Sequence, residues 1–384
     1  MDFATIGAMA FAIIAVAING IPQLLYAKDR GFKLKPVAFA YFLAAGLNLL
    51  FGSVTPISAQ AETITVASET KDMKARIWAM VLAAIIMTAL GLFGLVSALA
   101  DAVGVAVVSG MMAGVGMMLC EVSYDFTVKN KDKVYTWTSL VSIVSAVGSW
   151  MLFKSDANSV VYTIGISVIV STLFYVLVRK AFPLPEVAET LPADQPKESF
   201  LKDYKAFFTG GFVDKALIGT TIIGMLNLVC MGIGCNISFG GITGSIAGMS
   251  QNLNHLTIVN AVADFISVPA GGLPLEGIIS GTAGAPNPIL TGALMMAFIG
   301  ILIITGAVEK MGKFVPAQAI SGFLLVIGFV LTVIPSVSAV IAVGTSVAIA
   351  AGIAAMGMTI LSKNPFYGML AGVIVNLLAP LLGL

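Results

Sequence analysis

Apolar runs of about 20 residues recur along the whole chain, and they constrain its fold more than any other feature. A run of this length is what an α-helix needs to cross a bilayer. Hydrophobic residues make up 58% and charged residues 10% of the 384 residues, whereas soluble domains carry roughly 25% charged residues. The sequence therefore predicts an all-α polytopic integral membrane protein.

Charge balance and the scarcity of metal-binding side chains narrow the function classes. The net charge of +1 argues against nucleic acid as a partner. Three cysteines in or beside apolar segments and the single His255 cannot supply a dense metal site. No nucleophile and base pair lies within the apolar segments. We therefore expect no enzyme activity, no cofactor and no metal, while a channel remains an alternative class that the sequence does not exclude.

The apolar runs divide into fourteen predicted transmembrane segments, seven on each side of a polar stretch. The first seven cover 5–27, 36–52, 53–70, 76–99, 102–120, 135–153 and 159–181. The second seven cover 216–248, 256–270, 271–287, 288–308, 314–334, 336–361 and 364–384. Pro, Glu, Asp and Lys are frequent between Pro183 and Lys205, as in a linker. We expect a first half at 1–182, a cytoplasmic linker at 183–214 and a second half at 215–384.

The distribution of the basic residues predicts which side of the membrane each loop lies on. If every segment crosses, 19 of the 20 Lys and Arg residues fall on one side and only Lys154 falls on the other. Such a bias is typical of cytoplasmic loops. It predicts that the basic loops and the linker are cytoplasmic and that both termini lie outside. We expect the membrane to be the cell (inner) membrane of a prokaryote.

The two halves share a pattern of small residues at a fixed offset. Gly94, Ser109, Gly110 and Gly116 recur 212 residues later as Gly306, Ser321, Gly322 and Gly328. Seven crossings per half would give the halves opposite orientations, and inverted repeats are typical of secondary transporters. The alternative is a chance likeness between Gly- and Ala-rich helices. We expect two inverted seven-segment repeats.

The third segment of each half is short and interrupted by glycine and proline. These segments read FGSVTPISAQAET from Phe51 and AGGLPLEGIISGT from Ala270. Non-helical backbone at membrane depth must pair or line a cavity. We expect one extended piece from each half to pair with the other, and each to lead into a half-helix. The N–H groups and partial positive charge at the half-helix starts would form a substrate site.

These segments resemble those of two transporter families. FGSVTPISAQAET resembles the third segment of sulfate permeases, and GGLPLEGIISGTAG resembles their tenth. NAVADFISVPAGGLP is similar to the ninth-to-tenth segment region of nucleobase transporters of the uracil/xanthine permease group. The resemblance implies fourteen segments in two inverted sets of seven, a core domain and a gate domain, and commonly a homodimer.

The sequence departs from both families at identifiable places. Gly281 stands where sulfate permeases often have an arginine, and 216–248 lacks the acid that nucleobase transporters often carry in the eighth segment. The sequence ends at Leu384, directly after the last segment, so we expect no regulatory domain of the sulfate-permease type. Both families usually keep their termini in the cytoplasm, which is opposite to the sidedness predicted here.

Glu62 is the first candidate for chemistry, because ionisable side chains at membrane depth are costly and usually functional. The family comparison places it near the start of the first half-helix, two residues after Gln60. A carboxylate and an amide together suit the planar edge of a nucleobase, and a buried carboxylate can take up a proton. The alternative is a solvated Glu62 near the membrane interface.

The second broken segment supplies further candidates. By analogy, Glu276 lies on the extended piece before a half-helix that begins at 280–282, as a second proton site or as a helix N-cap carboxylate. We expect Asp264 to form hydrogen bonds within the protein. The predicted substrate-binding residues are Ser58, Gln60, Glu62, Asn236, Ser238, Glu276, Ser280, Gly281 and Thr282, with Glu62 and Glu276 also coupling protons.

Three further groups of polar residues are weaker candidates for a functional role. Asn236, Ser238 and Thr243 lie among glycines, as in a kinked substrate-facing helix or in close helix packing. Asn19 and Gln23 flank Pro22 at the matching place in the first half. We expect His255 to be a loop residue.

Taken together, the sequence predicts secondary active transport, with core and gate domains that rock about a central site. The main hypothesis is proton-coupled symport of a nucleobase or similar small planar solute, because Gln60 and Glu62 lie at the expected site without an arginine. The alternative is a sulfate-permease-like transporter of sulfate, bicarbonate or a carboxylate. Helix dipoles favour an anion, and an ionised Glu62 opposes it. The expected partners are the small-molecule substrate, a proton and the lipid bilayer.

Overall fold

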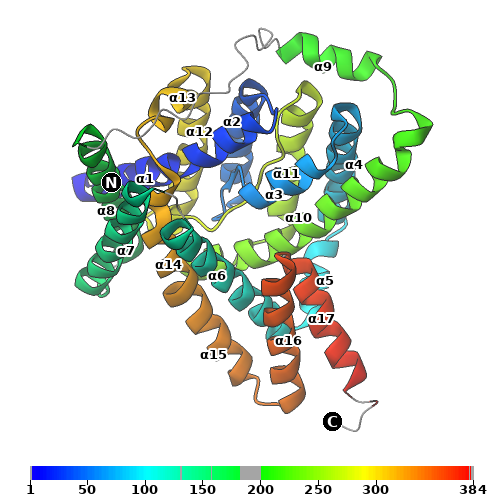
Figure 1. Cartoon of the computed structure of the whole chain (residues 1–384). Coiled ribbons are helices and arrows are strands. Elements are labelled where there is room, and N and C mark those ends of the chain that lie inside the picture. Colours follow the sequence, from blue (N-terminus) through cyan, green and yellow to red (C-terminus); the bar gives the residue numbers. More distant parts are fainter. Residues whose placement is uncertain (1, 130–131, 157, 182–199, 380, 382–384) are drawn as a thin grey trace.

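The computed structural model describes residues 2–129, 132–156, 158–181, 200–379 and 381. Nearly all of these residues lie in helices (Figure 1). Eight stretches within the described residues are long and apolar enough to span a membrane. They are α1 (Phe3–Asp29), α2 (Leu34–Phe51), α4 (Met73–Leu92), α6 (Val105–Val128), α7 (Lys133–Phe153), α8 (Ser159–Ala181), Lys215–Ala247 and Ala317–Ala342. The protein is thus an integral membrane protein.

Two of these spans are composite, and shorter elements complete the fold. Lys215–Ala247 joins η1 (Lys215–Leu217) to α10 (Ile218–Ala247), and Ala317–Ala342 joins η4 (Ala317–Ile320), α14 (Ser321–Leu325), η5 (Val326–Val333) and α15 (Ile334–Ala342). The other helices are α3 (Ala61–Glu69), α5 (Leu95–Val103), α9 (Phe200–Thr209), α11 (Leu253–Ser267), η2 (Val268–Ala270), η3 (Gly281–Gly284), α12 (Pro288–Ile304), α13 (Ala307–Gly312), α16 (Ser346–Ser362) and α17 (Pro365–Leu378).

The helix ends follow local sequence signals. Asp72 caps α4 by accepting from the Ala75 N–H at 2.8 Å, and Asn364 caps α17 just before Pro365. Proline is favoured at such a first position because its missing N–H would have no helical partner there. Gly52 and Gly248 end α2 and α10 with φ of 63° in each case, a conformation that glycine adopts without strain.

Most predicted segments coincide with helices, but the boundary predicted between 314–334 and 336–361, at Pro335, is wrong. The segment expected at 336–361 divides at Gly344, whose φ is 80°. Its first part belongs to the preceding span, which runs through Pro335 to Ala342. Pro335 does not end that span, because it follows the π-helical turns of η5, where the regular i→i−4 hydrogen bonds are already replaced. Residues 183–199 of the expected linker lie outside the described residues. The rest contains α9, which lies at one end of the molecule (Figure 1) and contacts η2.

The two broken segments pair with each other, as expected. β1 (Ile57–Ser58) and β2 (Glu276–Gly277) are antiparallel, with Ile57 opposite Gly277 and Ser58 opposite Glu276. The Ile278 N–H extends the ladder by donating to the Pro56 carbonyl at 3.0 Å. This pairing satisfies backbone groups that would otherwise be unpaired at membrane depth.

The expectation of two half-helices is wrong for the second segment. β1 leads into the nine residues of α3, but β2 leads only into η3, a 3₁₀ turn of four residues. The sequence GTAGAPNP explains the difference, since two glycines and two prolines within eight residues disfavour an α-helix there. The fold therefore presents one half-helix start near its centre.

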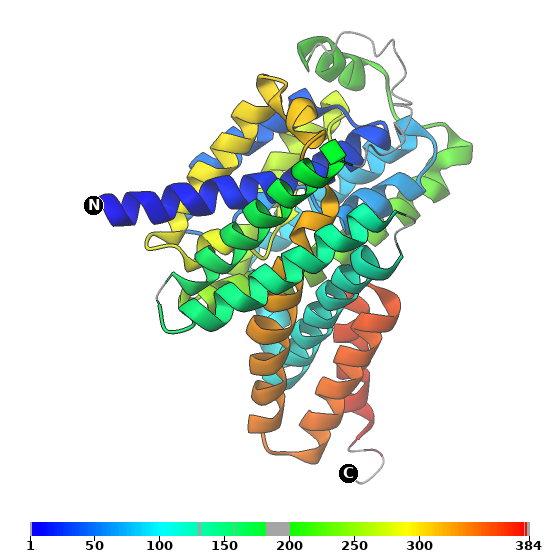
Figure 2. The ribbon, with the colours of Figure 1, turned by 60° about the vertical axis from the view of Figure 1, so that its left-hand side comes forward.

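The 212-residue glycine pattern has structural counterparts. Gly94 and Gly306 are both left-handed N-caps, with φ of 72° and 68°, of the short helices α5 and α13. Gly116 on α6 and Gly328 on η5 contact each other reciprocally, and a Cβ on either would lie 2.6 Å from the carbonyl oxygen of the other. The two halves therefore cross at equivalent glycines, where α6 runs alongside α14 and η5 (Figure 2).

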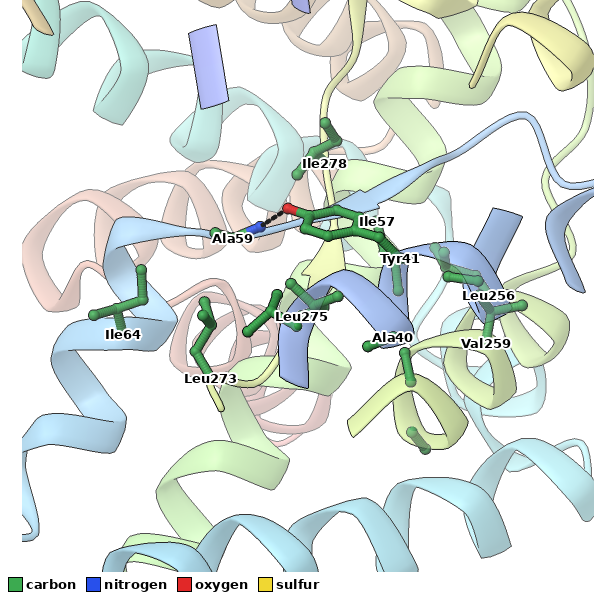
Figure 3. Close-up of a cluster of buried hydrophobic side chains, with 14 of the residues drawn as sticks. Ala40, Tyr41, Ile57, Ala59, Ile64, Leu256, Val259, Leu273, Leu275 and Ile278 are labelled. Carbon is green, nitrogen blue, oxygen red and sulfur yellow. Dashed lines mark hydrogen bonds between the residues drawn. The ribbon is translucent and has the colours of Figure 1, made fainter. Parts of the chain in front are cut away.

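The largest apolar cluster surrounds the paired strands. Many of its members come from α2, α11, α12 and the two broken segments, and Figure 3 shows Tyr41, Ile57, Leu256 and Leu275 among them. The amide of Gln251 adds a polar attachment, because its Oε1 accepts from the N–H groups of Val54 and Thr55 at 3.1 and 3.2 Å. Residues from both halves thus fix the backbone that precedes β1.

Candidate functional site: a cavity at the start of α3

A cavity of about 820 Å³ opens beside the start of α3. Its wall is built from α1, the β1–α3 segment, the residues directly after β2, α6, α10, the span 317–342 and the junction of α16 and α17. Polar and charged residues on the wall are Asn19, Gln23, Tyr26, Ser58, Gln60, Glu62, Thr65, Glu69, Asn227, Ser362, Lys363, Asn364 and Tyr367. The remaining wall is mainly apolar, with Val16, Met231, Phe239, Ile279, Phe323 and Leu324 among its members.

The structure brings together three of the predicted site residues on this wall: Ser58, Gln60 and Glu62. Gln60 is the N-cap of α3, and its side chain makes no capping hydrogen bond. Glu62 lies in the first turn of α3. The first N–H groups of a helix have no intrahelical partner and carry partial positive charge. The α3 start therefore offers donors for an anion, and an ionised Glu62 would compete for the same positive potential.

Tyr41 fixes the extended piece from behind the wall. Its hydroxyl accepts from the Ala59 N–H at 3.1 Å (Figure 3) and lies 2.7 Å from Ser58 Oγ. If Tyr41 donates its proton to Ser58, the Ser58 hydroxyl keeps its own proton for the cavity. Tyr41 and Ala59 are fully buried and Ser58 is 3% exposed. If Ser58 donates to Tyr41 instead, the Ser58 oxygen is left as an acceptor on the cavity wall.

Helix α1 contributes a polar face to the same cavity. Asn19, Gln23 and Tyr26 lie three or four residues apart, on one side of the helix around Pro22. The buried Asn19 Oδ1 has no hydrogen-bond partner within the described part of the chain. Tyr26 bonds Thr65 of α3 across the cavity wall, with 2.9 Å between the hydroxyl oxygens.

Several wall residues were not anticipated. Tyr26, Thr65 and Glu69 could have been found from helical spacing, since Tyr26 shares a helix face with Asn19 and Gln23, and Thr65 and Glu69 share one with Glu62. Lys363, Asn364 and Tyr367 had no sequence signal, because they reach the cavity through the tertiary arrangement of the α16–α17 loop. Lys363 pairs with Glu121 of α6 and is the only basic residue on the described wall.

The other predicted site residues lie away from this cavity. Asn236 donates to Thr257 Oγ1 at 3.0 Å, and Ser238 donates to the Gly234 carbonyl of its own helix at 2.6 Å. Thr243 donates to the Ile278 carbonyl at 2.9 Å. These buried contacts account for the polar groups of α10 by close packing, and a substrate role for Asn236 and Ser238 stays a prediction.

The η3 turn is also occupied by its own contacts. The hydroxyls of Ser280 and Thr282 lie 2.8 Å apart, and the Thr282 N–H donates to Ser280 Oγ at 3.2 Å. Gly281 packs against Ile164 and Val16, so an added Cβ would collide there. A substrate role for Ser280, Gly281 and Thr282 likewise stays a prediction.

Of the remaining ionisable candidates, Glu276 is buried and Asp264 and His255 are half-buried. Asp264 Oδ1 accepts from the Leu275 N–H at 2.8 Å, which confirms the expected internal hydrogen bond. Glu276 is 6% exposed and lies in β2 rather than at a helix start, so its interpretation as an N-cap is wrong because Ser280 caps η3. His255 is not a loop residue: it lies in α11 and stacks on Phe51, with ring centroids 4.6 Å apart.

Comparison with known proteins bears on the fold. No model of a known protein family matches the sequence, and no curated protein is similar to it in sequence. Among solved structures, the transmembrane domain of a cyanobacterium bicarbonate transporter, BicA, superimposes with a TM-score of 0.62 at 16% identity, over 97% of this chain and 98% of that one.

Structures of SLC26A9 give a similar result. One superimposes with a TM-score of 0.60 at 14% identity, over 99% of this chain and 66% of that chain. The murine Slc26a9 anion transporter in the inward-facing state gives 0.50 at 15% identity, over 94% and 68%. These comparisons support the sulfate-permease resemblance at the level of the fold and do not confirm the nucleobase one. This chain shares its fold with the membrane domains of these transporters.

Proposed function

We propose that this protein is a secondary transporter that carries a small anion, of the bicarbonate or carboxylate kind, through the cavity at the start of α3. One observation carries the proposal: α3 begins on the cavity wall directly after β1, so its first N–H groups lie beside the polar side chains of Ser58 and Gln60. Helix starts of this kind bind anions. The fold shared with a bicarbonate transporter and an anion transporter supports the same substrate class.

Glu62 would couple the proposed transport to the uptake of a proton. In its ionised form the carboxylate would repel an anion and occupy the positive end of α3 itself. Protonation removes the charge and turns the carboxyl into a donor. A proton would therefore enter the site together with the anion, which is symport.

A nucleobase is the second candidate substrate. Gln60 and Glu62 lie two residues apart on the wall of a cavity that is large and mainly apolar. Such a wall also suits a planar solute with donor and acceptor edges. Uptake of the two substrate classes must therefore be measured side by side.

We further propose that the chain crosses the membrane fourteen times, as two inverted halves that rock as core and gate domains. Three observations support this topology: the pairing of β1 with β2, the matched caps at Gly94 and Gly306, and the reciprocal Gly116–Gly328 contact. Symmetric crossings at equivalent positions are what an internal twofold axis predicts. A homodimer stays an expectation from the family resemblance.

Uptake into proteoliposomes tests the substrate and the coupling together. Labelled bicarbonate, sulfate and small carboxylates are compared with uracil and xanthine, with and without an imposed proton gradient. We expect gradient-dependent accumulation of an anion. Glu62→Gln should abolish accumulation and leave exchange intact, because a permanently neutral side chain still admits the anion but no longer carries the proton.

The matched control is Glu69→Gln, which removes a second acid of α3 that also lies on the cavity wall, beyond its first turn. It should accumulate the anion as the wild type does. Unchanged accumulation by Glu62→Gln would remove Glu62 from the coupling mechanism. Uptake of a nucleobase and of no anion would replace the proposal with the second candidate.

A further inference from the structure

A second cavity, of about 500 Å³, lies between α9 and the start of α4. It shares no wall residue with the cavity at the start of α3. Three charged side chains line it, from Lys33, Lys74 and Asp203. Most of the remaining wall is apolar side chains and glycine backbone, including Met73, Ile77, Trp78, Phe207 and Gly211. The cavity therefore combines a few charges with a large apolar surface.

Charged and apolar groups are ordered along the axis of α4. Lys74 lies in the first turn of the helix, and Ile77 and Trp78 follow three and four residues later. Residues at these spacings share one helix face, and four residues correspond to about 6 Å along the axis. Tryptophan is frequent at the level of lipid headgroups. This face thus presents a cation at the end of a membrane helix and an apolar surface one turn deeper.

Lys74 is the charge that the protein leaves unpaired in this cavity. Lys33 Nζ lies 2.7 Å from Asp203 Oδ2, whereas Lys74 takes part in none of the ion pairs found in the described residues. Asp72, which is close to it in sequence, is not on the wall and accepts from the Ala75 N–H at 2.8 Å. The cavity consequently carries one positive charge in excess, which a ligand with a single negative charge would match.

Helix α9 places this cavity at the surface of the membrane. On its inner side, Phe207 packs against Trp78 with ring centroids 4.6 Å apart. On its outer side, Leu201 and Phe208 are 78% and 65% exposed, and Lys205 is exposed as well. A helix with exposed apolar and basic side chains is typical of one that lies in the plane of the interface. Figure 1 shows α9 at one end of the molecule, as such a position requires.

We propose that this cavity binds one anionic phospholipid of the bilayer. Its phosphodiester pairs with Lys74, and an acyl chain lies against Ile77 and Trp78. Basic pockets at the cytoplasmic ends of membrane helices hold headgroups of this kind. A zwitterionic lipid fits less well, because its own amine already neutralises the phosphate. The bound lipid fills the space between α4 and α9 and holds the two helices together.

Fluorescence of Trp78 tests the contact directly, because the chain has only three tryptophans. Trp137→Phe and Trp150→Phe leave Trp78 as the single fluorophore in the full chain. The protein is reconstituted into phosphatidylcholine vesicles in which the same minor share of lipid is either brominated phosphatidylglycerol or brominated phosphatidylcholine. Bromine on an acyl chain quenches a tryptophan that it touches. We expect brominated phosphatidylglycerol to quench Trp78 several-fold more strongly than brominated phosphatidylcholine.

Matched variants test the part played by charge. Lys74→Gln should reduce quenching by brominated phosphatidylglycerol to the level of phosphatidylcholine. Lys71→Gln removes an exposed lysine three residues earlier that is not on the wall, and it should quench as the parent does. Native mass spectrometry covers the case in which the tryptophan variants do not fold. The protein with all its tryptophans should retain one phosphatidylglycerol molecule, and Lys74→Gln should lose it.

The remaining outcomes would overturn the proposal. Equal quenching by the two brominated lipids, or equal losses in Lys74→Gln and Lys71→Gln, would show that the cavity does not select charge. Relief of quenching by soluble glycerol phosphate would assign the cavity to soluble phosphate esters. No quenching by either lipid would mean that protein covers the cavity. None of these measurements involves transport, so their result is independent of the proposed function.

Discussion

At the scale of single residues, the Tyr41 hydroxyl makes two contacts that shape the cavity wall. It accepts from the Ala59 N–H and lies within hydrogen-bond distance of Ser58 Oγ. Because Ala59 is fully buried, its N–H has no access to water as an alternative acceptor. The same hydroxyl thus supports the backbone before α3 and holds the Ser58 hydroxyl, which lines the cavity.

We predict that Tyr41→Phe destabilises the protein and weakens anion binding. The Ala59 N–H would be left unpaired, which costs about 1–3 kcal/mol, and Ser58 would be free to turn its proton away from the cavity. The unfolding temperature should fall and the KM for uptake should rise more than kcat falls. Tyr124→Phe, whose residue is 60% exposed, should change neither quantity; an equal KM for Tyr41→Phe and the wild type would show that Ser58 is oriented without Tyr41.

Part of the cavity wall was predictable from the sequence. Ser58, Gln60 and Glu62 stand out as polar residues on a broken apolar segment, and Asn19 and Gln23 stand out around a proline within a helix. The η3 residues and those of α10 have the same polar character, yet their hydrogen bonds are internal. Residue type does not distinguish the two cases, because the direction of a side chain depends on tertiary packing.

At the scale of elements, the Gly116–Gly328 crossing fixes the distance between α6 and η5. A Cβ at Gly116 would lie 2.6 Å from a backbone oxygen, so the helices would have to separate. Small residues at membrane helix crossings allow this close approach. The contact therefore explains why both halves keep glycine at this offset.

We predict that Gly116→Ala lowers stability although alanine is the better helix former. The overpacking should cost about 1–3 kcal/mol and appear as a lower unfolding temperature in detergent. Gly148→Ala on α7 makes the same chemical change where nothing lies within 4 Å of the added Cβ, so it should leave the temperature unchanged or raise it. Equal behaviour of the two variants would mean that the crossing tolerates separation.

Element boundaries were less predictable than element existence. Hydropathy predicts the spans well, but the predicted boundary falls at Pro335, whereas the helices divide at Gly344. Their roles depend on the conformation around each residue: Pro335 follows π-helical turns, while Gly344 adopts φ of 80° before the Thr345 cap of α16. The missing second half-helix similarly reflects the glycine and proline content of 281–288, which disfavours an α-helix there.

At the scale of the whole molecule, sidedness is the main prediction still to be measured. The basic residues place Lys74 inside and Lys154 outside. After replacement of Cys120, Cys230 and Cys235, a membrane-impermeant maleimide should label Lys154→Cys in intact cells and Lys74→Cys only after permeabilisation. Both original side chains are exposed, so access to the reagent does not limit the comparison. The reverse pattern would place the termini in the cytoplasm, as in the families that the sequence resembles.

The strand pairing at the centre also sets how early during synthesis the fold can be completed. Ile57 pairs with Gly277, which is 220 residues later in the chain. At 5–20 residues per second, a ribosome needs roughly 10–45 s to make that distance. During this interval the backbone groups of β1 lack their partner strand, and an unpaired strand edge can pair with another chain. Assembly of this protein therefore depends on how the nascent first half is shielded until its partner strand has been synthesised.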